Sequence, residues 1–157
     1  MPSPTPHAGS GSGSVDARLL KEEHDWLVSI SRDPANSSPK FRLPDLIGAC
    51  VTIVFEQDDP LDVIFHILHS TVILRGSDAA RRQERIFEGD FTSLQEIQRS
   101  PANRYPNPCF SLDQIVSACV AHVRTQGVEA RDLFDRARAN TARRALPPHG
   151  SAEVGGV

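Results

Sequence analysis

Apolar residues recur at helical spacing in two stretches of the chain, and the pattern predicts a helix in each. The first stripe consists of Leu46, Ile47, Cys50, Val51 and Val54. The second consists of Ile115, Val116, Cys119, Val120 and Val123. β-Branched residues are frequent in both stretches and would also suit strands, but the period and the Ala-Cys centre favour helices.

A short strand is expected directly before each helix, because Pro-x-Phe-x-Leu alternates in hydrophobicity at 39–43 and at 108–112. The phenylalanine and leucine of each segment would point inward. The outward positions would be Lys40, Arg42, Cys109 and Ser111.

A second helix is expected to follow each of the first two. Asp59 and Pro60 are typical of a helix start, with Asp as N-cap and Pro at the first helical position. Gly127 is typical of a helix end. The second helices are predicted over about 61–73 and 129–144.

The chain contains an internal similarity between two segments of equal length. Residues 39–72 align with residues 108–141 without a gap, with nine identities in 34 positions. The identical pairs are Pro39/Pro108, Phe41/Phe110, Leu43/Leu112, Ala49/Ala118, Cys50/Cys119, Val51/Val120, Val54/Val123, Gln57/Gln126 and Phe65/Phe134. One such unit buries too little apolar surface to offset its ordering entropy, so we expect the two units to pack together.

The remaining segments are predicted from composition and periodicity. Residues 1–14 and 146–157 are rich in Pro, Gly and Ser and read as a disordered and a flexible tail. Residues 15–31 carry an apolar stripe and an acidic polar face, which predicts an N-terminal amphipathic helix. Residues 32–38 read as a linker to the folded domain.

Residues 73–107 lie between the two copies and are too long for a simple connection. A strand is expected at 85–87, and a capping box at Ser93 and Glu96 predicts a helix start. The predicted fold class is therefore mostly α with short strands (α+β), with two pseudo-symmetric strand-helix-helix repeats in one domain. The domain would span 39–145, with repeat one at 39–72, the insert, and repeat two at 108–145.

Composition narrows the class of protein. The 157 residues carry a net charge of −3, and no apolar run reaches the length of a membrane span. Three widely spaced cysteines give neither a disulfide framework nor a zinc pattern, so we expect a reduced, cytoplasmic protein. Fifteen arginines against two lysines are typical of a GC-rich bacterial genome. The modest total hides an acidic repeat one (net −3) and a basic segment 73–145 (net +3).

A strand followed by two helices, completed by a second copy, resembles the ribbon-helix-helix DNA-binding family. FRLPD at 41–45 is similar to its strand-to-helix junction, and VEARDLFDRA after Gly127 to its second-helix start. The resemblance implies an antiparallel ribbon in the DNA major groove, with second-helix N-termini on phosphates. The residues carried over as nucleic-acid-binding are Lys40, Arg42 and Ser111.

The resemblance implies a bacterial DNA-binding regulator or plasmid-maintenance protein, since tandem units in one chain occur in bacterial conjugation. Its partner would be DNA, and the chain could form a homodimer. The alternative is a protein-protein interaction module, an adaptor or antitoxin-like protein, because repeat one is acidic. No Gly-rich phosphate loop, nucleophile elbow or metalloprotease motif occurs, so neither catalysis nor a cofactor is expected.

Three further groups of residues are candidate sites. His66 and His69 are spaced as metal ligands, but no third ligand has suitable spacing, so we expect no metal. Cys50 and Cys119 lie on the apolar stripes and are expected to be buried core thiols near a pseudo-two-fold axis. The arginines of 73–145 suit either a phosphate-binding surface or a solvated helix face with i, i+4 pairs, and the second is favoured. They include Arg75, Arg81, Arg82, Arg85, Arg131, Arg136, Arg138, Arg143 and Arg144.

Overall fold

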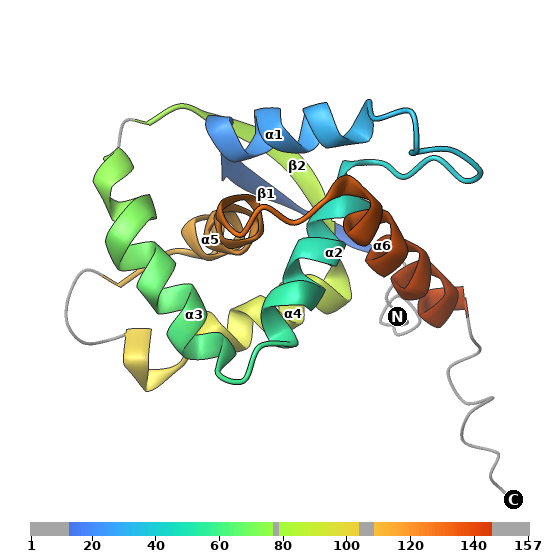
Figure 1. Ribbon diagram of the computed structural model, residues 1–157. Helices are drawn as coiled ribbons and strands as arrows, with labels where there is room; N and C mark the ends of the chain where they lie inside the picture. Colours follow the sequence, from blue (N-terminus) through green and yellow to red (C-terminus); the bar gives the residue numbers. More distant parts are fainter. Residues whose placement is uncertain (1–12, 77–78, 104–108, 146–157) are drawn as a thin grey trace, which may run out of the picture.

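The computed structural model describes residues 13–76, 79–103 and 109–145. Within these residues, six α-helices pack around one two-stranded antiparallel sheet (Figure 1), so the protein is a mostly helical α+β protein, as predicted. None of the helices in this part of the chain has the length and apolarity needed to cross a membrane. The predicted tails fall almost wholly outside the described residues, although Ser14 already belongs to the first strand.

The elements follow the same order twice along the chain: a strand and then three helices. The first set is β1 (Ser14–Leu20), α1 (Lys21–Ser31), α2 (Leu43–Phe55) and α3 (Pro60–Ile67), which continues as the π-helical turn η2 (Leu68–Val72) and the 3-10 turn η3 (Ile73–Arg75). The second set is β2 (Arg81–Phe87), α4 (Glu88–Gln98), the 3-10 turn η4 (Pro101–Asn103), α5 (Leu112–Thr125) and α6 (Ala130–Ala145).

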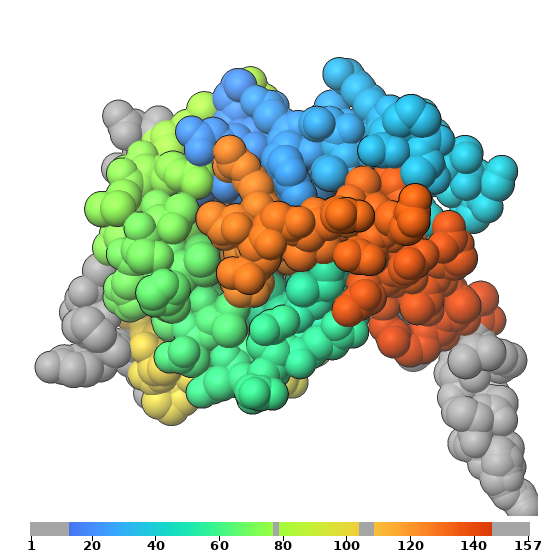
Figure 2. Space-filling model, viewed as in Figure 1, coloured from blue at the N-terminus to red at the C-terminus, as the bar shows by residue number. Residues whose placement is uncertain are grey.

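The two strands form an antiparallel ribbon, with Ala17 directly opposite Glu84. Opposite residues share a face of the ribbon, and successive residues alternate between faces. One face carries Ala17, Leu19 and Ile86, all buried in the core. In Figure 1 the ribbon runs behind α2 and α5, while Figure 2 shows the helical side, with α1, α3 and α6 at its surface.

The core joins the first set of elements to the second. Helix α2 packs on β2, helix α5 packs on β1, and the two helices also contact each other. Each long helix therefore covers the strand of the other set. The buried apolar side chains form one continuous cluster, which includes Cys50 and Cys119, as predicted for these two thiols.

The helices predicted from apolar stripes are confirmed. Helices α2 and α5 cover both stripes, and α3 and α6 follow them. Asp59 caps α3 by accepting a hydrogen bond from the backbone N–H of Asp62, with Pro60 at the first position. Gly127 follows the end of α5 with φ of 69°, in the left-handed region that favours glycine.

The prediction of strands at 39–43 and 108–112 is wrong for the residues that the structure describes, which leave out residue 108. Phe41 and Phe110 are buried, as the alternation indicated, but their backbones are bound by side chains instead of a neighbouring strand. The Asn36 amide donates to the carbonyls of Ser31 and Phe41 at 2.9 and 3.0 Å, and accepts from the Phe41 N–H at 2.7 Å.

Asn103 makes the same three contacts in the second set. Its amide donates to the carbonyls of Gln98 and Phe110 at 2.9 and 3.0 Å, and accepts from the Phe110 N–H at 2.9 Å. Both asparagines are buried. These contacts satisfy the backbone of each phenylalanine, which leaves it no need of a strand partner.

The predictions for the N-terminal segment and the insert also need correction. Residues 14–20 form β1, so the helix predicted over 15–31 begins only at Lys21. The strand expected at 85–87 is the end of β2, and α4 begins at Glu88, with no capping role for Ser93. Both strands depend on a partner that is distant in the sequence, which local periodicity cannot reveal. The linker 32–38 carries the buried Asn36 and is part of the fold.

Candidate nucleic-acid interface

The ribbon exposes one face, and its central positions carry polar side chains. Asp16 lies opposite Arg85, and Arg18 lies opposite Gln83. All four side chains are exposed. Arg18 follows Ala17 and Arg85 follows Glu84, so the two arginines flank the central Ala17–Glu84 pair on opposite sides. A two-stranded ribbon of this kind has the width that the major groove of B-DNA admits.

Arg85 is held in place by weak, exposed contacts. Its guanidinium donates to the Ser14 hydroxyl at 2.9 and 3.0 Å and to an Asp16 carboxylate oxygen at 3.1 Å. Both side chains of the Arg85–Asp16 pair are 55% exposed. Exposed ion pairs contribute about 0–1 kcal/mol, so Arg85 can exchange these partners for an anionic ligand at little cost.

A pocket of about 480 Å³ lies between the ribbon and the start of α2. Arg42, the N-cap of α2, lines it together with Arg85, Glu84, Phe87 and Ser14. Two arginines from elements far apart in the sequence therefore border the same hollow. Its polar lining and its position at the ribbon edge suit contact with a phosphate backbone.

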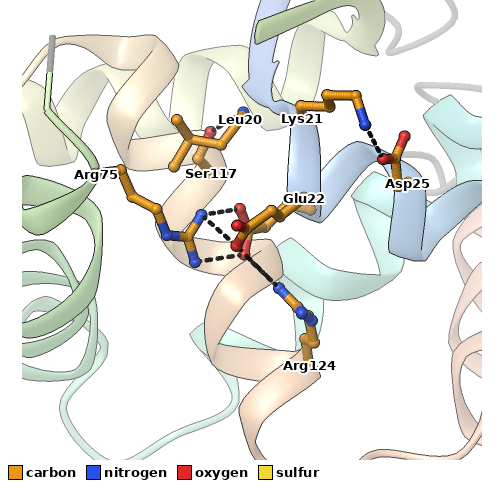
Figure 3. Close-up of polar contacts among 8 residues, drawn as sticks. Leu20, Lys21, Glu22, Asp25, Arg75, Ser117 and Arg124 are labelled. Atoms are coloured by element: carbon orange, nitrogen blue, oxygen red, sulfur yellow. Dashed lines mark hydrogen bonds and ion pairs between the residues drawn. The ribbon is translucent and has the colours of Figure 1, made fainter. Parts of the chain in front are cut away.

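Helix α5 holds the outer edge of β1 in place. The Arg18 N–H donates to an Asp113 carboxylate oxygen at 2.9 Å, and the Leu20 N–H donates to the Ser117 hydroxyl at 3.0 Å (Figure 3). These bonds satisfy backbone donors that an edge strand would otherwise leave open. The exposed side chain of Arg18 thus projects from a fixed backbone.

A buried ion-pair network fixes the junction between the ribbon and the helices. Glu23 on α1 has a side chain only 1% exposed and accepts from Arg75 at 2.6 and 3.1 Å and from Arg124 at 3.1 Å. Figure 3 shows Arg75 and Arg124 converging on this point from two different elements. The hydrogen bond to Glu23 raises the pKa of Arg75 above its usual value.

Asp90 occupies the third position of α4, as Glu23 occupies the third position of α1, but its surroundings differ. Its Oδ2 is buried without a hydrogen-bond partner among the described residues. Burial raises the pKa of this carboxyl, and the charges of Arg144 and Arg143 only partly oppose the rise. A Cβ added at Gly48 would lie 2.9 Å from this oxygen, so the residue at 48 must be small.

Of the three predicted nucleic-acid-binding residues, only one lies beside the ribbon. Arg42 borders it, through the pocket it shares with Arg85. Ser111 caps α5, where its hydroxyl accepts from the Gln114 N–H. Lys40 is exposed in the loop before α2. None of them lies on a strand, so their placement on the ribbon is wrong.

The other candidate residues are accounted for by contacts within the fold. The His69 ring packs edge-on against Phe110, and no cluster of three metal-ligating side chains occurs in the described part of the chain. The arginine pairs are mostly long-range instead of i, i+4: examples are Arg136–Glu56 and Arg144–Asp45. They tie α6 to α2.

Burial keeps the two core thiols protonated. It raises the pKa of Cys119 to about 12 and that of Cys50 well above its usual value, with Cys119 adding to the effect at Cys50. Neither thiol is therefore a nucleophile at neutral pH.

The site residues that sequence reasoning missed are Asp16, Arg18 and Gln83, whereas Arg85 was named only as one of the arginines of 73–145. A signal for them existed in the sequence. Arg-x-Pro-Ala-Asn occurs at 32–36 and again at 99–103, an offset of 67. Extending the internal similarity through this motif would have aligned β1 with β2 and α1 with α4.

Comparisons with protein-family models, curated proteins and solved structures found no match to this chain.

Proposed function

We propose that the protein binds duplex DNA through the exposed face of the β1–β2 ribbon. The observation that carries the proposal is the placement of Arg18 and Arg85 on that face, one step to either side of the Ala17–Glu84 pair. Arginine is the side chain most often used for specific contacts to guanine, through O6 and N7. Gln83 lies on the same face, directly opposite Arg18, and is suited to adenine.

The proposal includes an internal duplication longer than the one predicted from sequence. Residues 14–75 and 81–145 would be two copies of a strand-helix-helix-helix unit. The shared Arg-x-Pro-Ala-Asn motif and the matching contacts of Asn36 and Asn103 support it. So does the register, since Ala17 and Glu84 are separated by the same offset as the two motifs and lie directly opposite each other. A pseudo-two-fold axis through that pair would exchange Arg18 with Arg85.

This arrangement keeps the antiparallel ribbon of the ribbon-helix-helix interpretation but moves it to β1 and β2, adds a helix to each unit and assigns no phosphate contact to the start of α6. The groove-facing residues become Arg18, Gln83 and Arg85, and Arg42 becomes a phosphate contact at the ribbon edge. The acidic turn at Asp58 and Asp59 then lies on the link between α2 and α3 and is no part of the ribbon. The negative charge of repeat one therefore weighs less against DNA binding than the sequence indicated.

We propose further that DNA binding serves bacterial transcription regulation or plasmid maintenance in the cytoplasm. The test is fluorescence anisotropy of the full chain with a mixed-sequence 30-bp duplex and with the DNA upstream of its own gene. We expect binding at low salt that weakens steeply as salt rises, because phosphate contacts release counterions. Absence of binding to both duplexes at 20 mM salt would overturn the proposal.

A second candidate function, protein-protein interaction, is favoured by one observation. Leu74 is 79% exposed, and Leu61 is also exposed beside a pocket of about 400 Å³ lined by Asp59, Asp62 and Phe65. A basic amphipathic helix would complement the acidic, partly apolar lining of this pocket. Under this proposal, Leu61→Ser would release a stoichiometric co-purifying protein. A full chain that purifies without any partner would argue against it.

A further inference from the structure

At the outward positions of the ribbon, one pair of corresponding positions holds the same residue and the other pair does not. Positions 18 and 85, which correspond at the offset of 67, both hold arginine. Positions 16 and 83 also correspond, but one holds Asp and the other Gln. Arg85 therefore lies opposite an acid that binds its guanidinium at 3.1 Å, while Arg18 lies opposite a neutral amide.

The flanks of the ribbon differ in the same sense. Arg42 borders the Arg85 side through the shared pocket. The corresponding residue of the second set, at an offset of 69, is Ser111, whose hydroxyl is engaged in capping α5. Beside Arg18 lies Asp113, which accepts from the Arg18 backbone. Position 42 thus offers a cation for a phosphate where position 111 offers a hydroxyl, while each flank also carries one acid, Glu84 on the Arg85 side and Asp113 on the Arg18 side.

We infer that the target is duplex DNA with two unlike half-sites, bound by one chain in a single orientation. This inference rests on the proposed function and specifies the class of DNA that the protein binds. A protein of two identical subunits imposes symmetry on its site, because each half is read by the same residues. Here the two halves of the ribbon belong to one chain and have diverged at positions that face the ligand.

The chemistry predicts how the half-sites differ. Arg18 with Gln83 suits a guanine next to an adenine, because the amide pairs with adenine N6 and N7. Arg85 with Asp16 suits a guanine and a cytosine, because a carboxylate accepts from the cytosine N4 amino group. Arg42 adds a phosphate contact on the Arg85 side only, so that half-site should contribute more of the salt dependence.

The experiment is selection of bound sequences from a random duplex pool, using the full chain and recovering only complexes that hold one chain per duplex. We expect a consensus whose two halves are not inverted copies of each other. Arg18→Ala should remove the preference in one half and Arg85→Ala in the other, each by about 5- to 150-fold against the preferred base. The informative variant is Asp16→Gln, which makes positions 16 and 83 identical and should move the consensus toward an inverted repeat.

The outcomes separate this inference from the function on which it rests. No binding of any duplex at low salt would overturn the proposed function. Binding with a palindromic consensus, or with no consensus, would overturn the inference and leave DNA binding in place. If Arg18→Ala and Arg85→Ala weakened the same half-site, the assignment of one arginine to each half would be wrong.

Discussion

Arg18 and Arg85 lie on the same exposed face of the ribbon, one residue beyond Ala17 and Glu84, which face each other across it. They come from strands that are far apart in the chain. Neither arginine belongs to an amphipathic helix, and the core does not need either of them. Their matched placement is the feature of the molecule that most directly indicates a ligand with a repeating backbone, such as DNA.

The two buried asparagines are expected to contribute similar amounts to stability. Asn36→Ala and Asn103→Ala each remove three hydrogen bonds and leave the backbone groups of a phenylalanine unsatisfied. We expect each to lower the free energy of unfolding by about 2–4 kcal/mol, measured by urea denaturation. Ser37→Ala, in the same loop as Asn36, is the control and should change it by less than about 0.5 kcal/mol. A small effect at either asparagine would contradict the matched role.

Loss of the Glu23 charge is expected to destabilise the protein. Glu23→Gln leaves Arg75 and Arg124 without their shared carboxylate. We expect a loss of about 2–3 kcal/mol in urea denaturation, below the ~3–5 kcal/mol of a fully buried pair, because both arginines keep part of their solvent contact. Lys21→Met, which breaks the exposed Lys21–Asp25 pair on the same helix, should cost less than about 1 kcal/mol. Equal effects from the two variants would argue against a special role for Glu23.

Loss of the Asp90 charge is expected to stabilise the protein, in contrast to loss of the Glu23 charge. Because the pKa of Asp90 is raised in the folded state, folding is more favourable when this carboxyl is protonated. That stability is present below the usual pKa of 3.8 and is lost as pH rises through the folded pKa. Asp90→Asn should therefore stabilise the protein at pH 7, by about 1 kcal/mol, and leave it little changed near pH 3.5.

The measurement is urea denaturation of both proteins at several pH values. The difference between them at each pH isolates Asp90 from His122, whose pKa is lowered by burial and which therefore destabilises the fold as pH falls. A variant that is less stable than the parent at pH 7 would show that Asp90 is better paired than its contacts indicate.

The three thiols are expected to differ sharply in reactivity. Cys109 is exposed, whereas Cys50 and Cys119 are buried with raised pKa values. A colorimetric thiol assay should titrate one thiol per folded chain rapidly and three in denaturant. The two core thiols should react at least about 100-fold more slowly, because each requires local opening. Rapid reaction of all three in the folded protein would contradict the packing of α2 against α5.

The long helices could be predicted from the sequence because their information is local. The stripe through Cys50 and its counterpart through Cys119 fix both the helices and their buried faces. The cap at Asp59 and the turn at Gly127 were equally readable, since side-chain capping and positive φ are properties of single residues.

The strands could not be predicted in the same way. Leu19 and Leu20 are adjacent apolar residues that fit the stripe of the following helix, so β1 reads as the first turns of α1. The alternation at Phe41 has a different cause, since Phe41 is buried and its backbone is bound by Asn36. Only the tertiary pairing of β1 with β2 decides between strand and helix here. The candidate site was misplaced for the same reason, because Arg18 and Arg85 become neighbours only through that pairing.

The most direct test of DNA binding by the ribbon compares the double variant Arg18→Ala/Arg85→Ala with Arg131→Ala. Arg131 is an exposed arginine in the first turn of α6, at the far end of that helix from Arg144, which stacks over Phe87 of β2. The double variant removes two positive charges and the control removes one, and neither alters a buried side chain. The measurement is the dissociation constant for a selected duplex, with circular dichroism to establish that the fold is intact.

We predict that the double variant binds at least about 30-fold more weakly than the parent, at about 1–3 kcal/mol for each guanine contact, while Arg131→Ala changes the constant by less than about threefold. A double variant that remains folded and binds the duplex as tightly as the Arg131→Ala control would contradict the ribbon as the DNA-binding surface.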